Sequence, residues 1–162
     1  MTPPMTSATR AACEIVLLNP NRYAEAGTRK LLPWLTELVA AVAPRAESLG
    51  VRFVGDRSMR LTNRQFRAKD QTTDVLSFPG EEAGAGGDAG TGHLGDILIS
   101  VPTARRQAEE AGHSVDLEIK TLLLHGILHC LGHDHETDQG EMERLERRLR
   151  KRWLAGETHG RG

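Results

Sequence analysis

Four of the chain's seven histidines fall within eleven residues, from His125 to His135. His125 and His129 are four residues apart, which places their side chains on one face of a helix. Residues 117–124 contain no Gly or Pro, so they favour a helix that carries both histidines. Gly132 follows, and glycine ends a helix in a left-handed turn at little steric cost. Such a turn would fold the chain back and bring His135 towards the first pair.

Three imidazoles that converge while a fourth position stays open form a common catalytic zinc site. A pair of histidines four apart is often a surface coincidence, but the added glycine and third histidine favour metal binding. We therefore predict that His125, His129 and His135 bind one Zn²⁺ per chain, with another divalent metal as the alternative. His133 is out of phase and is assigned to the surface or to the surroundings of the ligands. Asp134 either orients a ligand by accepting a ring N–H or serves as a turn residue.

The spacing of the three histidines and the glycine is also that of a class of zinc peptidases. Zinc peptidases of the metzincin class carry the pattern H-E-x-x-H-x-x-G-x-x-H, in which the glutamate is the general base. This chain keeps the three histidines and the glycine, but Gly126 replaces the glutamate. A peptidase that works through that glutamate is therefore disfavoured, whereas one with a displaced base stays open.

The run from His125 to His135 resembles the H-G-x-L-H-x-x-G-x-D-H signature of the YbeY family, bacterial rRNA-maturation factors. Other runs are similar to family motifs and keep their order: FRAKD at 66–70 with TDVLSFP at 73–79, and then LGDILIS at 94–100. The resemblance covers roughly residues 14–153. It departs at His133, where an aromatic residue such as tyrosine is expected, and in a Gly-rich insertion after Pro79. Neither departure touches a proposed ligand.

This resemblance implies a metal-dependent, single-strand-specific endoribonuclease that matures the 3′ end of 16S rRNA and serves ribosome quality control. It implies a zincin-like metal-binding helix, a catalytic role for Arg67, and rRNA and the small ribosomal subunit as partners. Ribosomal proteins and a ribosome-associated GTPase are further candidate partners. Two other classes stay open: a non-enzymatic ribosome-assembly factor with a structural metal, and a metallohydrolase with another substrate.

Arginines recur along one side of a helix that we predict over residues 57–68. They are Arg57, Arg60, Arg64 and Arg67. Such a stripe is usually a solvated face, but its place beside a family motif favours phosphate binding, because a guanidinium fork matches phosphate oxygens. We assign charge stabilisation to Arg67 and weaker RNA contacts to Arg60 and Arg64.

Two more residues are weaker candidates. Arg148 lies in the basic end of the last helix, where it either contacts RNA or simply complements the helix dipole. Asp96 interrupts the apolar run 94–100, and charges are rarely buried without a partner. Asp96 therefore anchors a ligand histidine, pairs with an arginine, or lies in solvent at a strand end.

Composition is that of a globular protein, with 162 residues of which 38% are hydrophobic and 27% charged. A net charge of −1 excludes a wholly basic nucleic-acid-binding surface, and 4% aromatic residues do not support a base-stacking platform. Cys13 and Cys130 indicate no disulfide framework, which fits a reducing cytoplasm; Cys130 is assigned to the core. Residues 1–10 lack the apolar core of a signal peptide, and we expect no membrane span and a cytoplasmic location.

Periodicity and turn residues place strands at 13–18, 51–54, 74–78 and 94–100. They place helices at 28–43, 57–68, 102–111, from 115 up to Gly132, and at 139–153. We expect Ser114 to cap the histidine helix, and Thr137 or Asp138 to cap the last one. This order predicts a single α+β domain over 13–154, with a small mixed four-stranded sheet and helices mainly on one face. Residues 1–10 and 155–162 are predicted to be disordered, and 80–93 to be a flexible loop.

Overall fold

The structure is a computed structural model that describes residues 12–18, 28–67, 74–81, 90–133 and 139–155. For residues 28, 29, 66 and 67 only the backbone is described. The elements in chain order are β1 (Glu14–Leu18), α2 (Thr28–Val42), β2 (Ala46–Val54), α3 (Asp56–Arg67), β3 (Val75–Pro79), β4 (Gly92–Ser100), α4 (Val101–Ala111), α5 (Val115–Cys130) and α6 (Glu141–Trp153).

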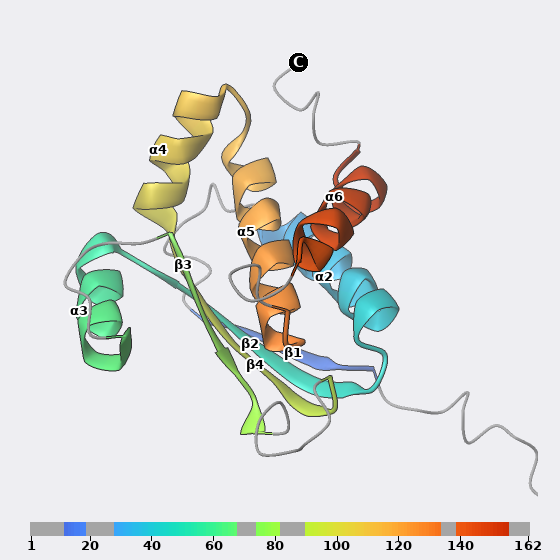
Figure 1. The fold of residues 1–162 in the computed structure, drawn as a ribbon. Helices are drawn as coiled ribbons and strands as arrows, with labels where there is room; N and C mark the ends of the chain where they lie inside the picture. Colours follow the sequence, from blue (N-terminus) through green and yellow to red (C-terminus); the bar gives the residue numbers. More distant parts are fainter. Residues whose placement is uncertain (1–11, 19–27, 68–73, 82–89, 134–138, 156–162) are drawn as a thin grey trace, which may run out of the picture.

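The four strands form one mixed sheet in the order β1-β2-β4-β3 (Figure 1). β1, β2 and β4 run parallel, and β3 pairs antiparallel with β4 at the edge. The parallel pair β1 and β2 is connected through α2, as a parallel connection requires a crossover. The predicted small mixed four-stranded sheet is therefore confirmed.

The main core lies between the sheet and the helices α2, α5 and α6, which cover one face (Figure 1). Phe53 and Ile97 from the sheet are fully buried in this core with Leu35 from α2 and Leu123 from α5. Burial of each such side chain stabilises the fold by about 1.5–3 kcal/mol. α3 packs elsewhere, because its Met59 is buried in a second, smaller cluster with Val54 and Leu76. Helices thus lie mainly on one face, as predicted.

The histidine helix α5 is buried around most of its circumference, and both of its ends are as predicted. At the start, the Ser114 side chain accepts a hydrogen bond from the Leu117 N–H at 3.0 Å. At the end, Gly132 adopts a left-handed conformation with φ 95°. The Gly132 N–H donates to the His129 carbonyl at 2.9 Å, and the His133 N–H donates to the Leu128 carbonyl at 3.0 Å. These two bonds form a Schellman motif that ends the helix.

Trp34 of α2 connects the three covering helices. Its ring N–H donates to the Trp153 carbonyl of α6 at 3.0 Å. The Lys120 ammonium of α5 lies 5.4 Å from the centre of the same ring and forms an ion pair with Asp116 at 3.1 Å. These contacts hold α6 beside α5. Among the described residues, no helix combines the length and apolar character that a membrane span needs.

Three element boundaries differ from the sequence prediction by two residues or more. β4 begins at Gly92 rather than at residue 94, so its first two residues lie in the segment that was predicted to be a flexible loop. β2 begins at Ala46 rather than at residue 51 because Ser48 and Gly50, although not apolar, pair with both neighbouring strands, with shifts of register against β4. α6 begins at Glu141 rather than at residue 139, after Gly140 in a left-handed conformation that makes no side-chain cap. The predicted caps, Thr137 and Asp138, lie outside the described residues.

Candidate metal centre

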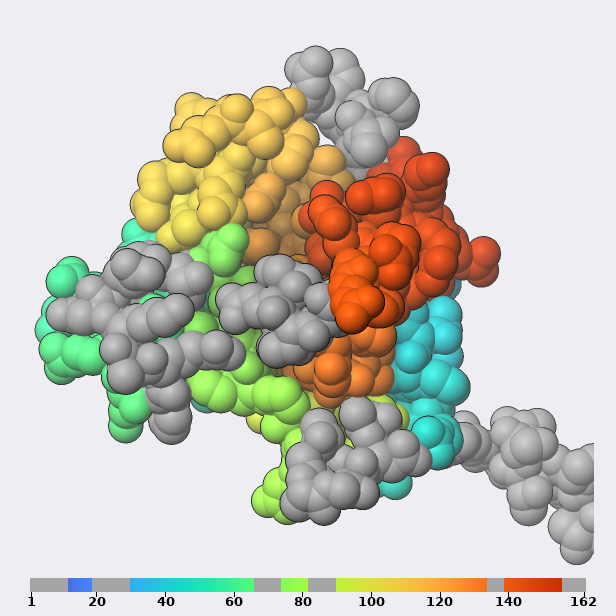
Figure 2. Space-filling model, viewed as in Figure 1, coloured from blue at the N-terminus to red at the C-terminus, as the bar shows by residue number. Residues whose placement is uncertain are grey.

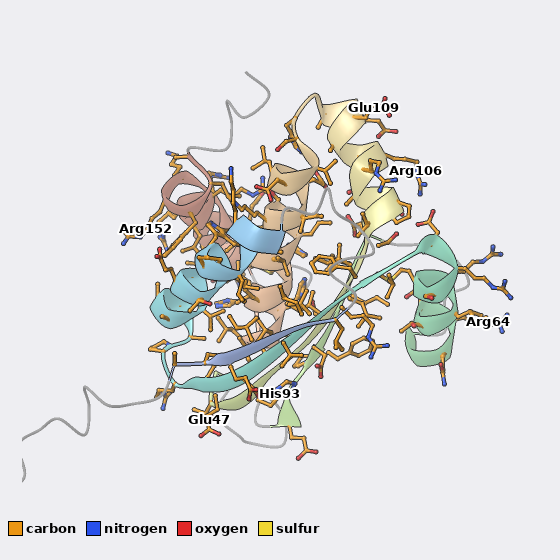
Figure 3. All side chains as sticks on the ribbon, turned by 180° about the vertical axis from the view of Figure 1, so that it is seen from behind. Glu47, Arg64, His93, Arg106, Glu109 and Arg152 are labelled. Atoms are coloured by element: carbon orange, nitrogen blue, oxygen red, sulfur yellow. The ribbon has the colours of Figure 1, made fainter. Side chains whose placement is uncertain are left out.

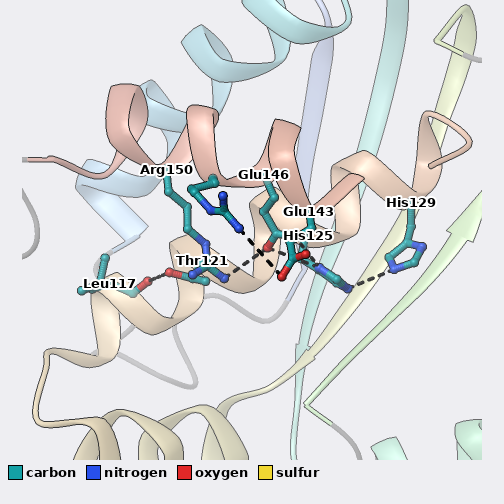
Figure 4. Close-up of polar contacts among 8 residues, drawn as sticks. Leu117, Thr121, His125, His129, Glu143, Glu146 and Arg150 are labelled. Atoms are coloured by element: carbon teal, nitrogen blue, oxygen red, sulfur yellow. Dashed lines mark hydrogen bonds and ion pairs between the residues drawn. The ribbon is translucent and has the colours of Figure 1, made fainter. Parts of the chain in front are cut away.

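His125 and His129 lie one turn apart on α5 and face each other, as their spacing predicts (Figure 4). Their Nε2 atoms are 3.0 Å apart, and their ring centres are 4.5 Å apart with an interplanar angle of 74°. Both side chains are half-buried. The two ring nitrogens therefore point at one small region beside α5.

Glu146 of α6 binds the other nitrogen of the His125 ring. Its carboxylate oxygens lie 3.2 and 3.4 Å from His125 Nδ1, and one of them also accepts from the Arg150 guanidinium at 3.2 Å (Figure 4). Burial alone raises the pKa of Glu146, but the hydrogen bond from His125 and the charge of Arg150 outweigh it and hold this pKa below its ordinary value. An ionised carboxylate only accepts hydrogen bonds, so this contact places a proton on His125 Nδ1; in the neutral imidazole the lone pair is then on Nε2.

This arrangement fits a divalent transition metal. Zn–N bonds of about 2.0–2.1 Å at a tetrahedral angle separate two ligand nitrogens by roughly 3.3 Å, close to the 3.0 Å between the two Nε2 atoms. A carboxylate on the far nitrogen of a ligand histidine is the usual support in zinc sites. Within the described ranges, no group of three or more potential metal-binding side chains occurs. The proposed third ligand, His135, and its neighbour Asp134 lie outside those ranges, so both assignments stay predictions.

Gly126 lies where α5 packs against β3 and β4. A Cβ atom at this position would lie 2.9 Å from Ser77 Oγ and 3.1 and 3.2 Å from two carbons of Ile97. A larger side chain fits only if Ser77 and Ile97, or the elements that carry them, shift. The structure thus gives a packing reason for the glycine that stands where zinc peptidases carry their general base.

A cavity of about 480 Å³ lies beside His125, between α5 and α6. α6 lies directly against α5 in the space-filling view, where the two helices are red and orange (Figure 2). The cavity is lined by His125 and, from α6 and its start, by Gly140, Met142, Glu143, Glu146, Arg147 and Arg150. His125 therefore belongs both to the wall of this cavity and to the candidate metal centre.

The predicted arginines lie at two separate places. Arg60 and Arg64 are exposed on α3, which lies apart from α5 at the β3 side of the sheet, and Arg64 extends outwards (Figures 1 and 3). Arg67 is the last residue of α3, and only its backbone is described, so its catalytic role stays a prediction. Arg148 is exposed on α6 but does not line the cavity, whereas Arg147 does.

Asp96 interacts with neither described ligand candidate. Its carboxylate lies 3.0 Å from His93 Nε2, and His93 Nδ1 lies 2.7 Å from Ser48 Oγ. The Asp96 side chain is 58% exposed. The carboxylate that supports His125 is instead Glu146, which the sequence prediction missed. The sequence contained one indication of this role: Glu146 lies four residues after Met142, so an acidic residue falls on the apolar face of the predicted helix.

Cys130 follows His129 but is not placed to bind a metal. Its side chain is fully buried in the core and packs against Gly95, as predicted. Burial, with a smaller effect of the Asp96 charge, raises the pKa of Cys130 to about 12. The thiolate that metal binding requires is therefore disfavoured.

The sheet, its covering helices and the paired histidines define an α+β protein with a candidate metal centre on its central helix. Residues 19–154 match the family described as endoribonuclease YbeY, so the chain belongs to the YbeY family. A protein of Thermotoga maritima solved in solution has the same fold, with a TM-score of 0.62 and 26% identity over 88% of this chain and 90% of that one.

Three relatives carry the name endoribonuclease YbeY. The protein of Solibacter usitatus is 53% identical over 96 residues, which are 59% of each chain. That of Nautilia profundicola is 54% identical over 97 residues, or 60% of this chain and 66% of the relative. That of Bacillus mycoides is 49% identical over 104 residues, or 61% and 67%. The chain thus spans about three fifths to two thirds of the length of these relatives.

Proposed function

We propose that this protein is a metal-dependent endoribonuclease that cuts single-stranded RNA. Its role is the processing of rRNA, at the 3′ end of 16S rRNA, and ribosome quality control in the cytoplasm. The observation that carries the proposal is the pair of Nε2 atoms of His125 and His129, 3.0 Å apart, in a chain of the YbeY family. The carboxylate of Glu146 on the far side of the His125 ring supports the same conclusion.

In this proposal His125, His129 and His135 hold one Zn²⁺, or another divalent metal. The bound metal would lower the pKa of a water molecule or polarise a phosphoryl oxygen. Glu146 keeps the proton on His125 Nδ1, so that Nε2 stays available as a ligand. Arg150 holds the Glu146 carboxylate in place through its 3.2 Å contact.

Arg67 stabilises the negative charge that develops on the phosphoryl group during cleavage. Gly126 carries no side chain, so the proton of the nucleophile is taken up elsewhere. The nucleophile is either water or the neighbouring 2′-hydroxyl of the RNA. The substrate is rRNA of the small ribosomal subunit, and ribosomal proteins or a ribosome-associated GTPase are the proposed protein partners.

The proposal is tested with purified protein on single-stranded RNA, on duplex RNA of the same sequence and on casein, with and without a chelator. We expect only the single-stranded RNA to be cut, and the chelator to abolish cleavage. Arg67→Ala should bind metal but lose most activity, and Arg67→Lys should recover only part, because lysine lacks the planar fork. Cleavage of casein alone would indicate another metallohydrolase, and no cleavage of any substrate would indicate a ribosome-assembly factor.

A further inference from the structure

The cavity beside His125 has features of a binding site that the metal centre does not use. Its volume of about 480 Å³ lies within the usual range for ligand pockets, about 300–1,000 Å³. His125 contributes both to the metal centre and to the cavity wall. A substrate held at the candidate metal centre would therefore lie next to this cavity.

The charged side chains that line the cavity differ in their exposure and in the strength of their ion pairs. Glu146 is engaged by His125 and Arg150, and its side chain is only 13% exposed. Arg147 is 64% exposed and pairs with Glu143, itself 75% exposed, at 4.0 Å. Such an exposed pair contributes little free energy, so Arg147 can exchange it for another anion at small cost.

Arg147 and Arg150 are the arginines of α6 that line the cavity; the remaining basic residues of the helix end do not. Arg148 and Lys151 are exposed on α6, and the Arg152 guanidinium lies 5.6 Å from the ring centre of Trp153 and extends away from α5 (Figure 3). No Phe, Tyr or Trp occurs among the described residues of the cavity wall, and the His125 ring there is engaged by Glu146. The cavity therefore suits a sugar and a phosphate better than a stacked base.

We propose that this cavity binds the nucleotide next to the scissile phosphodiester, and that Arg147 contacts the backbone phosphate of that nucleotide. The inference rests on the proposed RNA cleavage. RNA is a continuous chain, so a scissile phosphate at the metal centre places its neighbour beside His125. A guanidinium matches phosphate oxygens in charge and geometry. Because a phosphate contact reads no base, this subsite gives affinity and register with little sequence preference.

The first test compares Arg147→Ala with the matched control Lys151→Ala. Both remove one positive charge from the exposed surface of α6, but only Arg147 lines the cavity. Binding is measured by fluorescence anisotropy on a single-stranded 2′-O-methyl RNA octamer. We expect binding about tenfold weaker for Arg147→Ala and within twofold of wild type for Lys151→Ala. The slope of log K against log salt should fall by about 0.7 for Arg147→Ala alone. Metal content and melting temperature should be unchanged in both, since neither residue contacts His125.

The second test varies substrate length. A dinucleotide contains the scissile phosphate but no neighbouring one, so wild type and Arg147→Ala should cut it equally. On an octamer, the KM of Arg147→Ala should rise about tenfold while kcat changes less. Equal losses on both substrates, or equal binding by the two alanine variants, would overturn the subsite. If the dinucleotide turns over too slowly, the binding comparison decides.

The two proposals fail in different ways. If wild type cuts RNA and Arg147→Ala binds RNA as Lys151→Ala does, the subsite is wrong and the proposed function stands. If wild type binds RNA through Arg147 but never cuts it, the cleavage proposal is wrong and the cavity is an RNA-binding site only.

Discussion

At the scale of single residues, the contact between Glu146 and His125 decides which ring nitrogen is available to a metal. Glu146 also pairs with Arg150, but the Arg150 side chain is 52% exposed, so that pair alone contributes at most about 1 kcal/mol. Loss of a carboxylate that orients a ligand histidine typically costs 10–100-fold in metal affinity, or about 1.4–2.7 kcal/mol. The orienting role of Glu146 therefore outweighs its part in the surface ion pair.

We predict that Glu146→Ala lowers zinc affinity about 10–100-fold, as measured by competition with a fluorescent chelator. Glu146→Gln should lose less, because its amide oxygen can still accept from His125 Nδ1. The matched control is Glu143→Ala, which removes a carboxylate from the same cavity without a described contact to His125. His125→Ala removes a proposed ligand, should abolish stoichiometric zinc binding, and so serves as the reference for complete loss. Equal affinities for Glu146→Ala and Glu143→Ala would show that the carboxylate does not support the ligand.

At the scale of elements, α5 must approach the sheet closely to place its histidines beside α6. Gly126 allows this approach, since any Cβ there would crowd Ser77 and Ile97. Ala is the better helix former by about 1 kcal/mol, so the sequence gives up helix propensity for close packing at this position. The position of the candidate metal centre thus depends on a residue that has no side chain.

Gly126→Ala should lower the free energy of unfolding by about 1–2 kcal/mol, the cost of overcrowding less the gain in helix propensity. It should also weaken zinc binding. A shift of α5 moves His125 and His129 together, away from their positions relative to Glu146 on α6. Thermal unfolding and a zinc titration measure the two effects. A second substitution in the same protein, Ser77→Ala, removes the closest contact of the new Cβ, at 2.9 Å. The double variant should recover part of the lost stability and part of the lost zinc affinity. If Gly126→Ala is as stable as wild type, Ser77 and Ile97 accommodate the added methyl group without loss of free energy of unfolding, and the prediction is wrong.

Asp56 connects the starts of α3 and α4, because its carboxylate accepts hydrogen bonds from Ser100 at 2.6 Å, Thr103 at 2.8 Å and Arg106 at 3.1 Å. Burial raises the pKa of Asp56, but these three partners outweigh it and hold the pKa below its ordinary value. A lowered pKa stabilises the fold above the unfolded-state value of about 3.9, and this stability is lost as pH falls through the folded-state pKa.

Asp56→Asn should therefore destabilise the protein by about 1 kcal/mol near neutral pH. The difference from wild type should shrink below about pH 3.9, where wild-type Asp56 takes up a proton on unfolding. Urea unfolding at neutral pH and at about pH 3 measures both values. Glu109→Gln, an exposed change on α4, is the control and should show no difference at either pH. A difference that stays constant with pH would mean that the Asp56 charge is not involved.

Features encoded in neighbouring residues could be predicted from the sequence. The α5 helix, its Ser114 cap and its end at Gly132 depend on side chains within a few positions of each other. Features that join distant segments could not. Glu146 of α6 contacts His125 of α5, 21 positions earlier. Its place on the apolar face of the predicted helix marks it as unusual, but no local pattern indicates which residue it contacts. The early part of β2 was missed for a similar reason, since Gly50 belongs there only because strands on both sides pair with it.

At the scale of the whole molecule, the distribution of charge limits how RNA can be recognised. The net charge is −1, so affinity for the proposed RNA substrate would have to come from local basic sites, for which the exposed arginines of α3 and the arginines of α6 beside His125 are the candidates. Few aromatic residues are present, which disfavours readout of single-stranded bases by stacking. Free RNA should accordingly be cut slowly and with little sequence preference. Accuracy in the cell would then come from docking on the immature ribosomal subunit.

This leads to a prediction for the cell in which the protein is made. Deletion should leave small-subunit rRNA with unprocessed ends, most visibly at the 3′ end of 16S rRNA. Wild type supplied from a plasmid should restore accurate ends, whereas His129→Ala should not, because it removes one of the two Nε2 atoms that face each other 3.0 Å apart. The ends are mapped by sequencing, with protein levels matched by immunoblot. Accurate 3′ ends in the His129→Ala strain would mean that the metal centre is not the maturing activity, and would favour an assembly factor that acts without cleavage.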